Sequence, residues 1–282
     1  KTIESVLSIL DKLFSAKFDR KSTLIALGGG VIGDMTGFTA SMYQRGVDFI
    51  QVPTTLLAQV DASVGGKTGV NNSYGKNLIG AFYQPRAVYI NPSFLNTLPK
   101  REFAAGVAEA IKMAIMFDKE MFDFILNNTL EDEENIVKLI AKSVELKADV
   151  VNQDEKESGI RAVLNYGHTF GHVVENLTHY TRYLHGEAVA IGMVMANELA
   201  VILGLLSEQE AKVIQELLEK NSLPTTFVID DIEEFYEHFY LDKKSAAGNI
   251  AFILPNGSIG THTIKRDIPK ESVLLALEKF KG

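Results

Sequence analysis

The stretch Thr23-Leu24-Ile25-Ala26-Leu27-Gly28-Gly29-Gly30-Val31-Ile32-Gly33 decides the fold of the first part of the chain. A short apolar run that is typical of a buried strand is followed at once by three glycines, and residues 31–42 then carry apolar side chains at helical spacing. Gly28, Gly30 and Gly33 satisfy G-x-G-x-x-G between the strand and the helix. Such a turn lets backbone N–H groups approach a pyrophosphate at a helix N-terminus, so we predict a phosphate-binding turn, although a turn without a ligand has the same pattern.

The acidic residue that usually accompanies this turn is not in its expected place. In the first unit of a dinucleotide-binding fold, Asp or Glu follows roughly 20 residues later, at the end of the next strand. Here residues 47–52 predict that strand, and it ends in Val52-Pro53-Thr54-Thr55, whereas Asp34 lies inside the motif itself. We therefore expect a turn that holds phosphate without being the usual first unit.

The remaining pattern divides the chain into two parts. Residues 87–90 predict a third strand, and strands that alternate with helices indicate a parallel sheet. After Pro99 the spacing is mostly helical, and one hairpin is predicted from residues 250–254 and 258–264 around Pro255-Asn256-Gly257. The later helix-like segments are residues 103–126, 133–151, 166–177, 187–206, 208–218 and 269–280.

We therefore expect two domains of different class. The first, residues 1–98, is an α/β N-terminal nucleotide-binding domain with a partial, Rossmann-like parallel sheet. The second, residues 99–282, is a mostly α-helical metal- and substrate-binding domain with a small β-hairpin. The length of 282 residues agrees with about two domains.

Composition excludes several classes of protein. Hydrophobic residues make up 46% of the chain and charged residues 23%, which argues against a disordered chain. The net charge of −8 argues against general nucleic-acid binding, and the absence of Cys excludes disulfides and thiolate metal sites. The absence of Cys fits a reducing compartment, so we expect a cytoplasmic protein without a membrane span. The most apolar stretch, residues 188–206, contains Asn197 and Glu198 and is expected to be a buried helix.

A second glycine cluster resembles a P-loop but does not match the P-loop pattern. It is Val64-Gly65-Gly66-Lys67-Thr68-Gly69. The P-loop needs a glycine where this chain has Asp61, and residues 56–62 look helical rather than strand-like. We expect this segment to be a flexible polar loop that lies over an anionic ligand and carries Asp61, Lys67, Lys76 and Asn77. A solvated surface loop is the alternative.

The histidines indicate a metal site. His168 and His172 are four residues apart, which places both rings on one helix face, and His185 begins the next helix. Glu109 lies on an otherwise apolar helix and needs a partner if it is buried. Two imidazoles and one carboxylate with an open position are typical of a catalytic zinc site, although histidines buried in a core with a structural ion pair are the alternative. The other histidines are interpreted as surface residues: His179, His238 and His262.

Basic and amide side chains near these segments could surround a polyanion. Lys and Arg bind phosphate and carboxylate groups through charge-assisted hydrogen bonds. For a single lysine, a solvated face is the commoner explanation. The candidates are Lys67, Lys76, Lys112, Lys147, Arg161 and Asn165.

Three long motifs resemble the 3-dehydroquinate synthase family. They are GGGVIGD at residues 28–34, QVPTTLLAQVDASVGGK at residues 51–67 and LNYGHTFGH at residues 164–172. The resemblance runs from about residue 23 to the C-terminus. It implies a phosphate-eliminating carbon–oxygen lyase of the shikimate pathway that uses NAD and zinc, or cobalt in its place. It also implies a homodimer whose substrate binds in a cleft between the two domains.

The resemblance also assigns roles to residues. The metal ligands it implies are Glu109, His168 and His185. The substrate-contacting and proton-handling residues it implies are His172, Asn165, Lys112, Lys147, Arg161, Asp61, Lys67, Asn77 and Arg45, of which Arg45 reaches the partner subunit's site. One of Lys243 and Lys244 is also expected to face substrate. The NAD-contacting residues it implies are Gly30, Val31, Ile32, Gly33, Asp34, Thr54, Thr55, Lys67, Lys76, Phe94, Thr97 and Leu98.

The reaction implied by the resemblance converts 3-deoxy-D-arabino-heptulosonate 7-phosphate to 3-dehydroquinate and phosphate. It proceeds by oxidation, phosphate elimination, reduction and intramolecular aldol closure. The family usually carries a further N-terminal segment with the first strands and the adenosine pocket, so we expect this chain to be a fragment or to lack that segment. Three alternatives stay open from the sequence: another sugar-phosphate cyclase, a metal-binding dimerisation fragment without activity, and a metal-dependent alcohol dehydrogenase.

Overall fold

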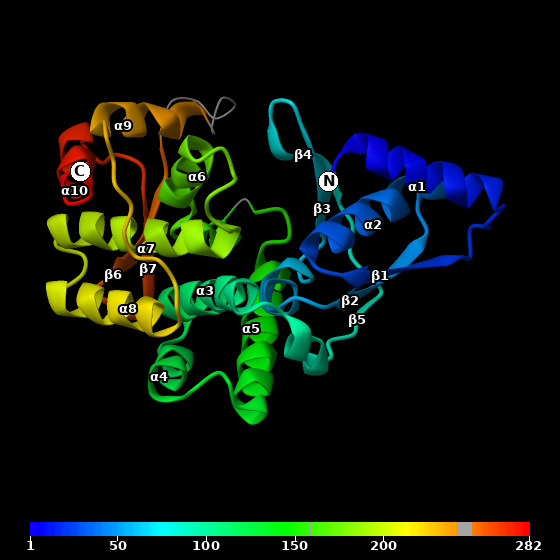
Figure 1. Ribbon diagram of the computed structural model, residues 1–282, viewed down its shortest axis with the longest axis horizontal. Coiled ribbons are helices and arrows are strands. Elements are labelled where there is room, and N and C mark those ends of the chain that lie inside the picture. The colour runs from blue at the N-terminus through cyan, green and yellow to red at the C-terminus, as the bar shows by residue number, and fades with distance from the viewer. Residues whose placement is uncertain (158, 242–249) are drawn as a thin grey trace. The chain divides into compact units, whose positions relative to one another are not determined.

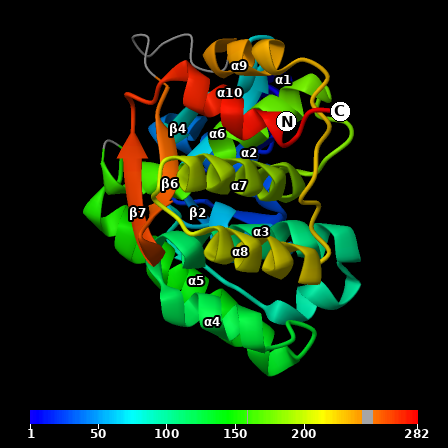
Figure 2. The same ribbon diagram turned by 90° about the vertical axis from the view of Figure 1, so that its left-hand side faces the viewer.

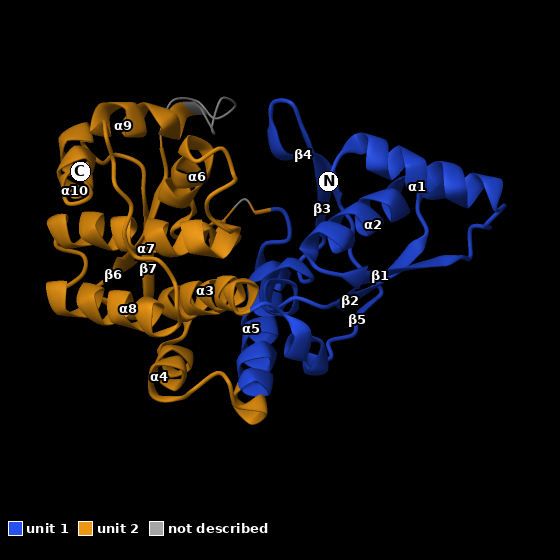
Figure 3. Cartoon of the chain, viewed as in Figure 1, with its two compact units in different colours: residues 1–99, 136–156 blue, residues 100–135, 157–282 orange. Residues whose placement is uncertain are grey.

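The computed structural model describes residues 1–157, 159–241 and 250–282 (Figure 1). Contacts within the chain divide it into two compact units (Figure 3). Unit 1 contains Lys1–Pro99 and Ile136–Lys156, and unit 2 contains Lys100–Asn135 and Glu157–Gly282. Most of helix α5 (Glu133–Gln153) therefore groups with unit 1, although it follows residue 99 in the sequence.

The centre of unit 1 is a three-stranded parallel sheet in the order β1-β2-β5. Its strands are β1 (Thr23–Gly28), β2 (Asp48–Pro53) and β5 (Ala87–Val88), the last of which is shorter than expected. Gly28 pairs with Pro53, and the backbone N–H of Thr54 donates to the carbonyl of Gly28 at 3.0 Å. The glycine turn and the Thr54-Thr55 segment therefore meet at the carboxyl edge of the sheet, where parallel α/β sheets bind ligands.

Two helices cover one face of this sheet. Helix α2 (Gly30–Met42) packs against β1 and β2, and α1 (Ile3–Ser15) packs against α2 (Figure 1). The side chains between them form one apolar core: Val6, Leu10, Leu13, Phe38, Ala40, Tyr43, Val47, Phe49 and Val70. Alternation along β1 buries Ala26 but leaves Ile25 66% and Leu27 60% exposed.

The segment expected to be a polar loop is instead an antiparallel hairpin, so that prediction was wrong. Strands β3 (Lys67–Asn72) and β4 (Gly75–Phe82) pair from Lys67 opposite Phe82 onwards. A Cβ at Gly80 would lie 2.1 Å from the carbonyl oxygen of Thr68, so the two backbones approach more closely than a side chain permits. The glycines that suggested a loop serve this close strand contact.

Unit 2 is mostly helical, with one hairpin. Its elements are α3 (Lys100–Phe117), α4 (Lys119–Asn127), η4 (Ile160–Asn165), α6 (His168–Leu177), α7 (His185–Ile202), α8 (Glu208–Lys220), α9 (Ile232–Leu241), β6 (Phe252–Asn256), β7 (Ser258–Lys265) and α10 (Lys270–Glu278). The expected helix over residues 103–126 is two helices, because the side chain of Asp118 accepts a hydrogen bond from the Met121 N–H and caps α4. Helix α9 has no counterpart among the helices predicted from the sequence.

Helix α7 is the central element of unit 2. It packs against α3, α6, α8, α10 and β6 (Figure 2). By length and composition α7 could also cross a membrane, but 78% of the helix is buried inside the structure. A helix that is apolar all round needs neighbours on every side, and here unit 2 supplies them. The prediction of a buried helix over residues 188–206 is therefore confirmed up to Ile202, where α7 ends.

Close helix contacts on α7 depend on glycine, which gives the first testable prediction. A Cβ at Gly192 would lie 2.0 Å from the carbonyl oxygen of Gly167, so Gly192→Ala should lower the free energy of unfolding by about 3 kcal/mol or more. Gly204→Ala is the control, because Gly204 has φ +66° and open space around its Cβ position. It should cost only about 1 kcal/mol of backbone strain. Urea unfolding measures both values, and equal losses would contradict the packing argument.

Candidate metal and substrate site

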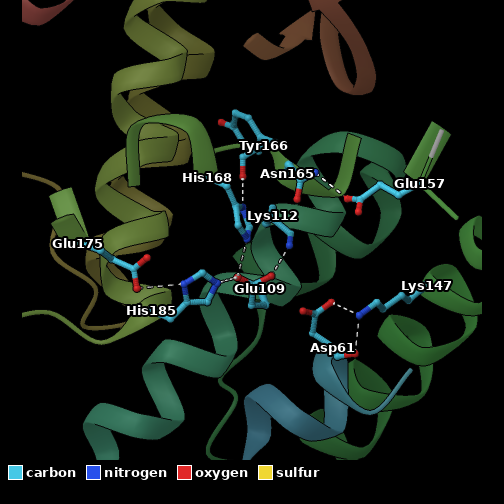
Figure 4. Close-up of polar contacts among 10 residues, drawn as sticks. All are labelled: Asp61, Glu109, Lys112, Lys147, Glu157, Asn165, Tyr166, His168, Glu175 and His185. Carbon is cyan, nitrogen blue, oxygen red and sulfur yellow. Dashed lines mark hydrogen bonds and ion pairs between the residues drawn. The ribbon is translucent and has the colours of Figure 1, made fainter. Parts of the chain in front are cut away.

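Three side chains from three helices of unit 2 converge. Glu109 lies in the middle of α3 and is fully buried, His168 is the first residue of α6, and His185 is the first residue of α7. Gly167 before His168 has φ +77°, a left-handed conformation that lets the chain turn directly into α6. One ligand atom from each of the three lies within 4.8 Å of the others (Figure 4).

The geometry of the Glu109 carboxylate indicates a cation. Its Oε2 accepts from the buried Lys112 Nζ, while its Oε1 is buried and has no hydrogen-bond partner among the described residues. The Nε2 atoms of His168 and His185 lie 3.9 and 3.7 Å from this oxygen, too far for hydrogen bonds. Bonds of about 2.0–2.2 Å to a tetrahedral zinc ion would separate its ligand atoms by roughly 3.4 Å. The donor set therefore fits a shared divalent cation.

The far side of each imidazole is held by a neighbour. The Nδ1 of His168 lies 3.1 Å from the Tyr166 carbonyl oxygen, and the Nδ1 of His185 lies 3.4 Å from Glu175 Oε1. In metal sites, a contact of this kind sets the tautomer and leaves Nε2 as the ligand atom. Both rings therefore present Nε2 towards Glu109.

The two imidazoles have opposite pKa shifts. Burial, and then the positive charge of Lys112 and the neighbouring rings, lower the pKa of His168 well below its ordinary value. Burial alone would also lower the pKa of His185, but the contact with Glu175 and the charge of Glu109 outweigh it and raise that pKa. A metal must therefore compete with a proton at His185 more than at His168.

His172 lies beside this group without belonging to it. Its ring centroid is 5.4 Å from that of His168 and 6.2 Å from that of His185. His172, Glu175 and His185 form a second group of possible ligands, which shares His185. The group with Glu109 is the stronger candidate because it contains the buried carboxylate oxygen without a partner among the described residues.

Two further predicted substrate residues of unit 2 lie on η4. Arg161 is only 2% exposed, so its guanidinium is among the most buried charges of the unit. The Nδ2 of Asn165 donates to Glu157 Oε1 at 2.8 Å, which fixes the amide and leaves its Oδ1 directed elsewhere. Lys112, Arg161, Asn165 and His172 thus all belong to unit 2.

In unit 1, Asp61 and Lys147 form a tight pair. Asp61 lies on the π-helix η2 (Ala58–Ala62), and Lys147 is a buried residue of α5. Lys147 Nζ contacts Asp61 Oδ1 at 2.7 Å and donates to the Asp61 carbonyl oxygen at 2.5 Å (Figure 4). Burial raises the pKa of Asp34 on α2, against the opposing charges of Lys1 and Lys147.

The predicted NAD-contacting segments meet at the carboxyl edge of the unit 1 sheet. Residues 30–34 form the first turn of α2, and a Cβ at Gly29 would lie 3.0 Å from Thr55 Cγ2, so these segments touch. The Nε2 of Gln59 donates to the carbonyl oxygens of Pro53 and Asn91. Asn91 caps η3 (Pro92–Thr97), which carries Phe94 and Thr97, and Leu98 follows it.

The remaining predicted residues are exposed. Lys67, Lys76 and Asn77 lie on the β3–β4 hairpin, and Arg45 lies on η1 (Tyr43–Arg45) with φ +72°. Lys243 and Lys244 lie outside the described residues.

Two histidine predictions were wrong. His238 is half-buried rather than a surface residue, and its Nδ1 lies 2.8 Å from the Glu234 carbonyl oxygen on α9. His262 is half-buried rather than a surface residue, because its Nδ1 lies 2.8 Å from the Met116 carbonyl oxygen and its ring packs on Phe117.

Several residues that position the proposed ligands were not predicted from the sequence. Glu175 is a buried carboxylate that follows two buried valines on α6, so the rule that drew attention to Glu109 would have found it. Glu187 accepts from the Leu184 N–H and binds Arg101 through both carboxylate oxygens at 2.6 Å, which fixes the start of α7. Glu157 has a left-handed backbone, φ +61°, which no sequence signal indicates.

Two family patterns match the chain. The 3-dehydroquinate synthase N-terminal family matches residues 1–105, and the 3-dehydroquinate synthase C-terminal family matches residues 106–245. The 3-dehydroquinate synthase of Sulfurovum sp. (strain NBC37-1) is 72% identical over 280 residues, which cover 99% of this chain and 80% of that protein. The 3-dehydroquinate synthase of a Nitratiruptor species is 60% identical, with the same coverage.

Solved structures share the fold. A 2-epi-5-epi-valiolone synthase from Streptomyces hygroscopicus subsp. jinggangensis 5008, with NAD+ and Zn2+ bound, has a TM-score of 0.91 and 28% identity over 99% of this chain and 79% of that one. A 2-deoxy-scyllo-inosose synthase complexed with carbaglucose-6-phosphate, NAD+ and Co2+ has a TM-score of 0.85 and 26% identity with the same coverage. A probable glycerol dehydrogenase from Sinorhizobium meliloti 1021 has a TM-score of 0.64 at 14% identity, over 99% of this chain and 81% of that one, and shows the fold alone.

The pH dependence of metal binding tests the assignment of His185. Below the raised pKa of His185 the proton displaces the metal, so zinc affinity should fall by about tenfold for each unit by which the pH is lowered. Because this pKa lies above the ordinary histidine value of about 6.5, the fall should already have begun when the pH reaches 6.5. Glu175→Gln removes the carboxylate that stabilises the protonated ring and should move this decline to lower pH. Competition with a chromophoric chelator from about pH 5 to 8 measures the affinity across the range in which histidine titrates. If the zinc affinity of Glu175→Gln falls over the same pH range as that of the unchanged protein, the assignment is contradicted.

Proposed function

The chain belongs to the 3-dehydroquinate synthase family, and we propose which of its residues carry out that family's reaction. The reaction converts 3-deoxy-D-arabino-heptulosonate 7-phosphate to 3-dehydroquinate with loss of phosphate, in the shikimate pathway. The enzyme is a carbon–oxygen lyase that uses NAD and a divalent metal, zinc or cobalt. We assign the nucleotide to residues 1–98, and the metal and most of the substrate contacts to residues 99–282.

Glu109, His168 and His185 hold the metal. The observation that carries this proposal is the buried Glu109 Oε1, which has no hydrogen-bond partner among the described residues and faces two imidazole nitrogens at 3.7 and 3.9 Å. When bound, the metal would supply Lewis-acid polarisation of a substrate hydroxyl, and NAD would supply reversible hydride transfer. The side chain of His185 is 38% exposed, which leaves a side of the group open to substrate.

The charge of this group favours an anionic substrate. Lys112 already neutralises the charge of Glu109, so a divalent ion beside the pair leaves the buried group with a net positive charge. An isolated buried charge is costly, and a bound phosphate or carboxylate would offset that cost. Arg161 adds a second buried cation in the same unit.

Amide and imidazole groups then orient the substrate and its protons. Glu157 fixes the Asn165 amide, so that Asn165 Oδ1 can accept from a substrate hydroxyl without rotating. His172, next to the two imidazole ligands, is our candidate for proton transfer to and from the substrate. In unit 1 we assign substrate contacts to Asp61, Lys67, Asn77, Lys147 and Arg45.

We assign NAD to the carboxyl edge of the unit 1 sheet. The start of α2 presents backbone N–H groups to a pyrophosphate, and glycine at residues 29 and 30 lets it approach the backbone. Thr54 and Thr55 lie against this turn and offer hydroxyl groups to the same ligand. The proposed contacts are Gly30, Val31, Ile32, Gly33, Asp34, Thr54, Thr55, Lys67, Lys76, Phe94, Thr97 and Leu98.

Phosphate release tests the metal assignment. His168→Ala and Glu109→Gln should each lower the rate of phosphate release from the heptulosonate phosphate by at least about a hundredfold, because Lewis-acid catalysis is worth several kcal/mol. A chelator should have the same effect on the unchanged enzyme, whereas the exposed His179 can be replaced by Ala without loss. Normal turnover of His168→Ala would contradict the assignment. Faster release from another sugar phosphate would favour a different cyclase, and net accumulation of NADH would favour an alcohol dehydrogenase.

We further propose a cytoplasmic homodimer in which Arg45 serves the partner's site. Arg45 is exposed on a left-handed turn, where its side chain is available to a second copy. Mixing the inactive variants Arg45→Ala and His168→Ala then creates mixed dimers with one intact site. Random exchange should restore about a quarter of the normal activity. No recovery in a mixture shown by native mass spectrometry to contain mixed dimers would contradict the role of Arg45.

A further inference from the structure

One face of α7 joins the metal site to a buried amide. His185, Val189, Met193 and Asn197 follow one another at intervals of four residues, so their side chains lie along one side of the helix. His185 begins this face, and Asn197, which is only 2% exposed, lies three turns further on. The face therefore has a proposed metal ligand at one end and a polar group, which no step of the reaction uses, near the other.

The turn that carries the second imidazole ligand packs along the same face. A Cβ at Gly167 would lie 2.7 Å from Met193 Cγ and 2.9 Å from the Val189 carbonyl oxygen, so the turn touches α7 directly. The rings of His168 and His185 lie 5.1 Å apart at the start of the face. The relative position of the two imidazoles therefore depends on how this turn sits on α7.

Tyr166 ties this turn to Asn197. Its hydroxyl donates to Asn197 Oδ1 at 2.5 Å and lies 3.5 Å from the Met193 carbonyl oxygen, and its side chain is fully buried. The carbonyl of the same residue accepts from His168 Nδ1. A single residue thus contacts α7 through its side chain and the metal ligand through its backbone. Figure 4 shows the second of these contacts, between Tyr166 and His168.

From this arrangement we propose that Tyr166 and Asn197 are positioning residues for the metal, an inference that rests on the metal site proposed above. Their hydrogen bond fixes the Tyr166 peptide relative to α7, and that peptide sets the orientation of the His168 ring relative to His185. Of the two oxygens near the Tyr166 hydroxyl, Asn197 Oδ1 is the closer by 1 Å, and losing a hydrogen bond to a buried group is costly, so this position is well defined. Metal ligands must be held to within about 0.5 Å of their working geometry, so the pair affects metal affinity without touching the metal.

The experiment measures zinc affinity and the visible spectrum of the Co2+-substituted protein, which reports ligand geometry. Tyr166→Phe removes only the hydroxyl and should lower zinc affinity about tenfold or more, the range seen when groups behind a ligand are lost. It should also shift the Co2+ absorption bands. Asn197→Leu should do the same, whereas Asn197→Asp keeps an acceptor oxygen and should retain most of the affinity and the normal spectrum.

A double variant tests whether the two residues act as one. If both substitutions break the same hydrogen bond, Tyr166→Phe combined with Asn197→Leu should lose no more zinc affinity than either alone. Tyr236→Phe is the matched control. The Tyr236 hydroxyl pairs with that of Tyr240 on α9, so its loss removes no contact with the metal ligands. Near-ultraviolet circular dichroism confirms that each variant is folded before metal is added.

Two outcomes separate this inference from the proposal beneath it. If Glu109→Gln does not weaken zinc binding, the metal site itself is wrong. If Glu109→Gln weakens it but Tyr166→Phe and Asn197→Leu bind zinc normally and keep the Co2+ spectrum, the hydrogen bond serves only stability and the positioning role is overturned. A normal spectrum in the single variants with losses that add in the double variant would also overturn it.

Discussion

The buried carboxylate of Glu109 is the constraint on which unit 2 depends. A fully buried anion needs compensation, and Lys112 on the next turn of α3 supplies it to only one of the two oxygens. The second oxygen has no hydrogen-bond partner in the described part of the chain, and the nearest ring nitrogens are too far away to donate. The protein therefore maintains a buried polar group that an added cation can satisfy, which is expected at a site built to bind one.

Helix α7 gives this group its second imidazole and its rigidity. A short face of α7 supports His185, the turn before α6 and the Tyr166 hydroxyl, while the rest of the helix is packed on all sides. The apolar sequence of α7 resembles a membrane span because a helix at the centre of a unit must be apolar on most of its sides. Gly192 permits the close approach of α6, so fold stability and site geometry depend on the same helix contact.

Much of the fold could be predicted from local sequence patterns. Hydrophobic periodicity and the glycine motif predict the parallel strands, the turn and most of the helices. The metal site was predicted from the helical spacing of His168 and His172 and from the isolated Glu109. The β3–β4 hairpin was missed because its glycines serve close strand contact rather than a loop. The contacts of Glu175 and Glu157 were missed because they depend on how separate segments pack, and His262 is half-buried for the same reason.

The fold by itself does not select the reaction. The same architecture occurs in a probable glycerol dehydrogenase at 14% identity, so the fold is compatible with more than one reaction. Elimination of phosphate further requires that the substrate's anionic groups be held while charge moves away from the reacting carbon. Unit 2 contains the buried positive charges of Lys112 and Arg161, which we propose meet this requirement, and Glu157 restrains the Asn165 amide on η4. We therefore propose that these groups, rather than the glycine turn or the helical bundle, adapt the fold to phosphate elimination.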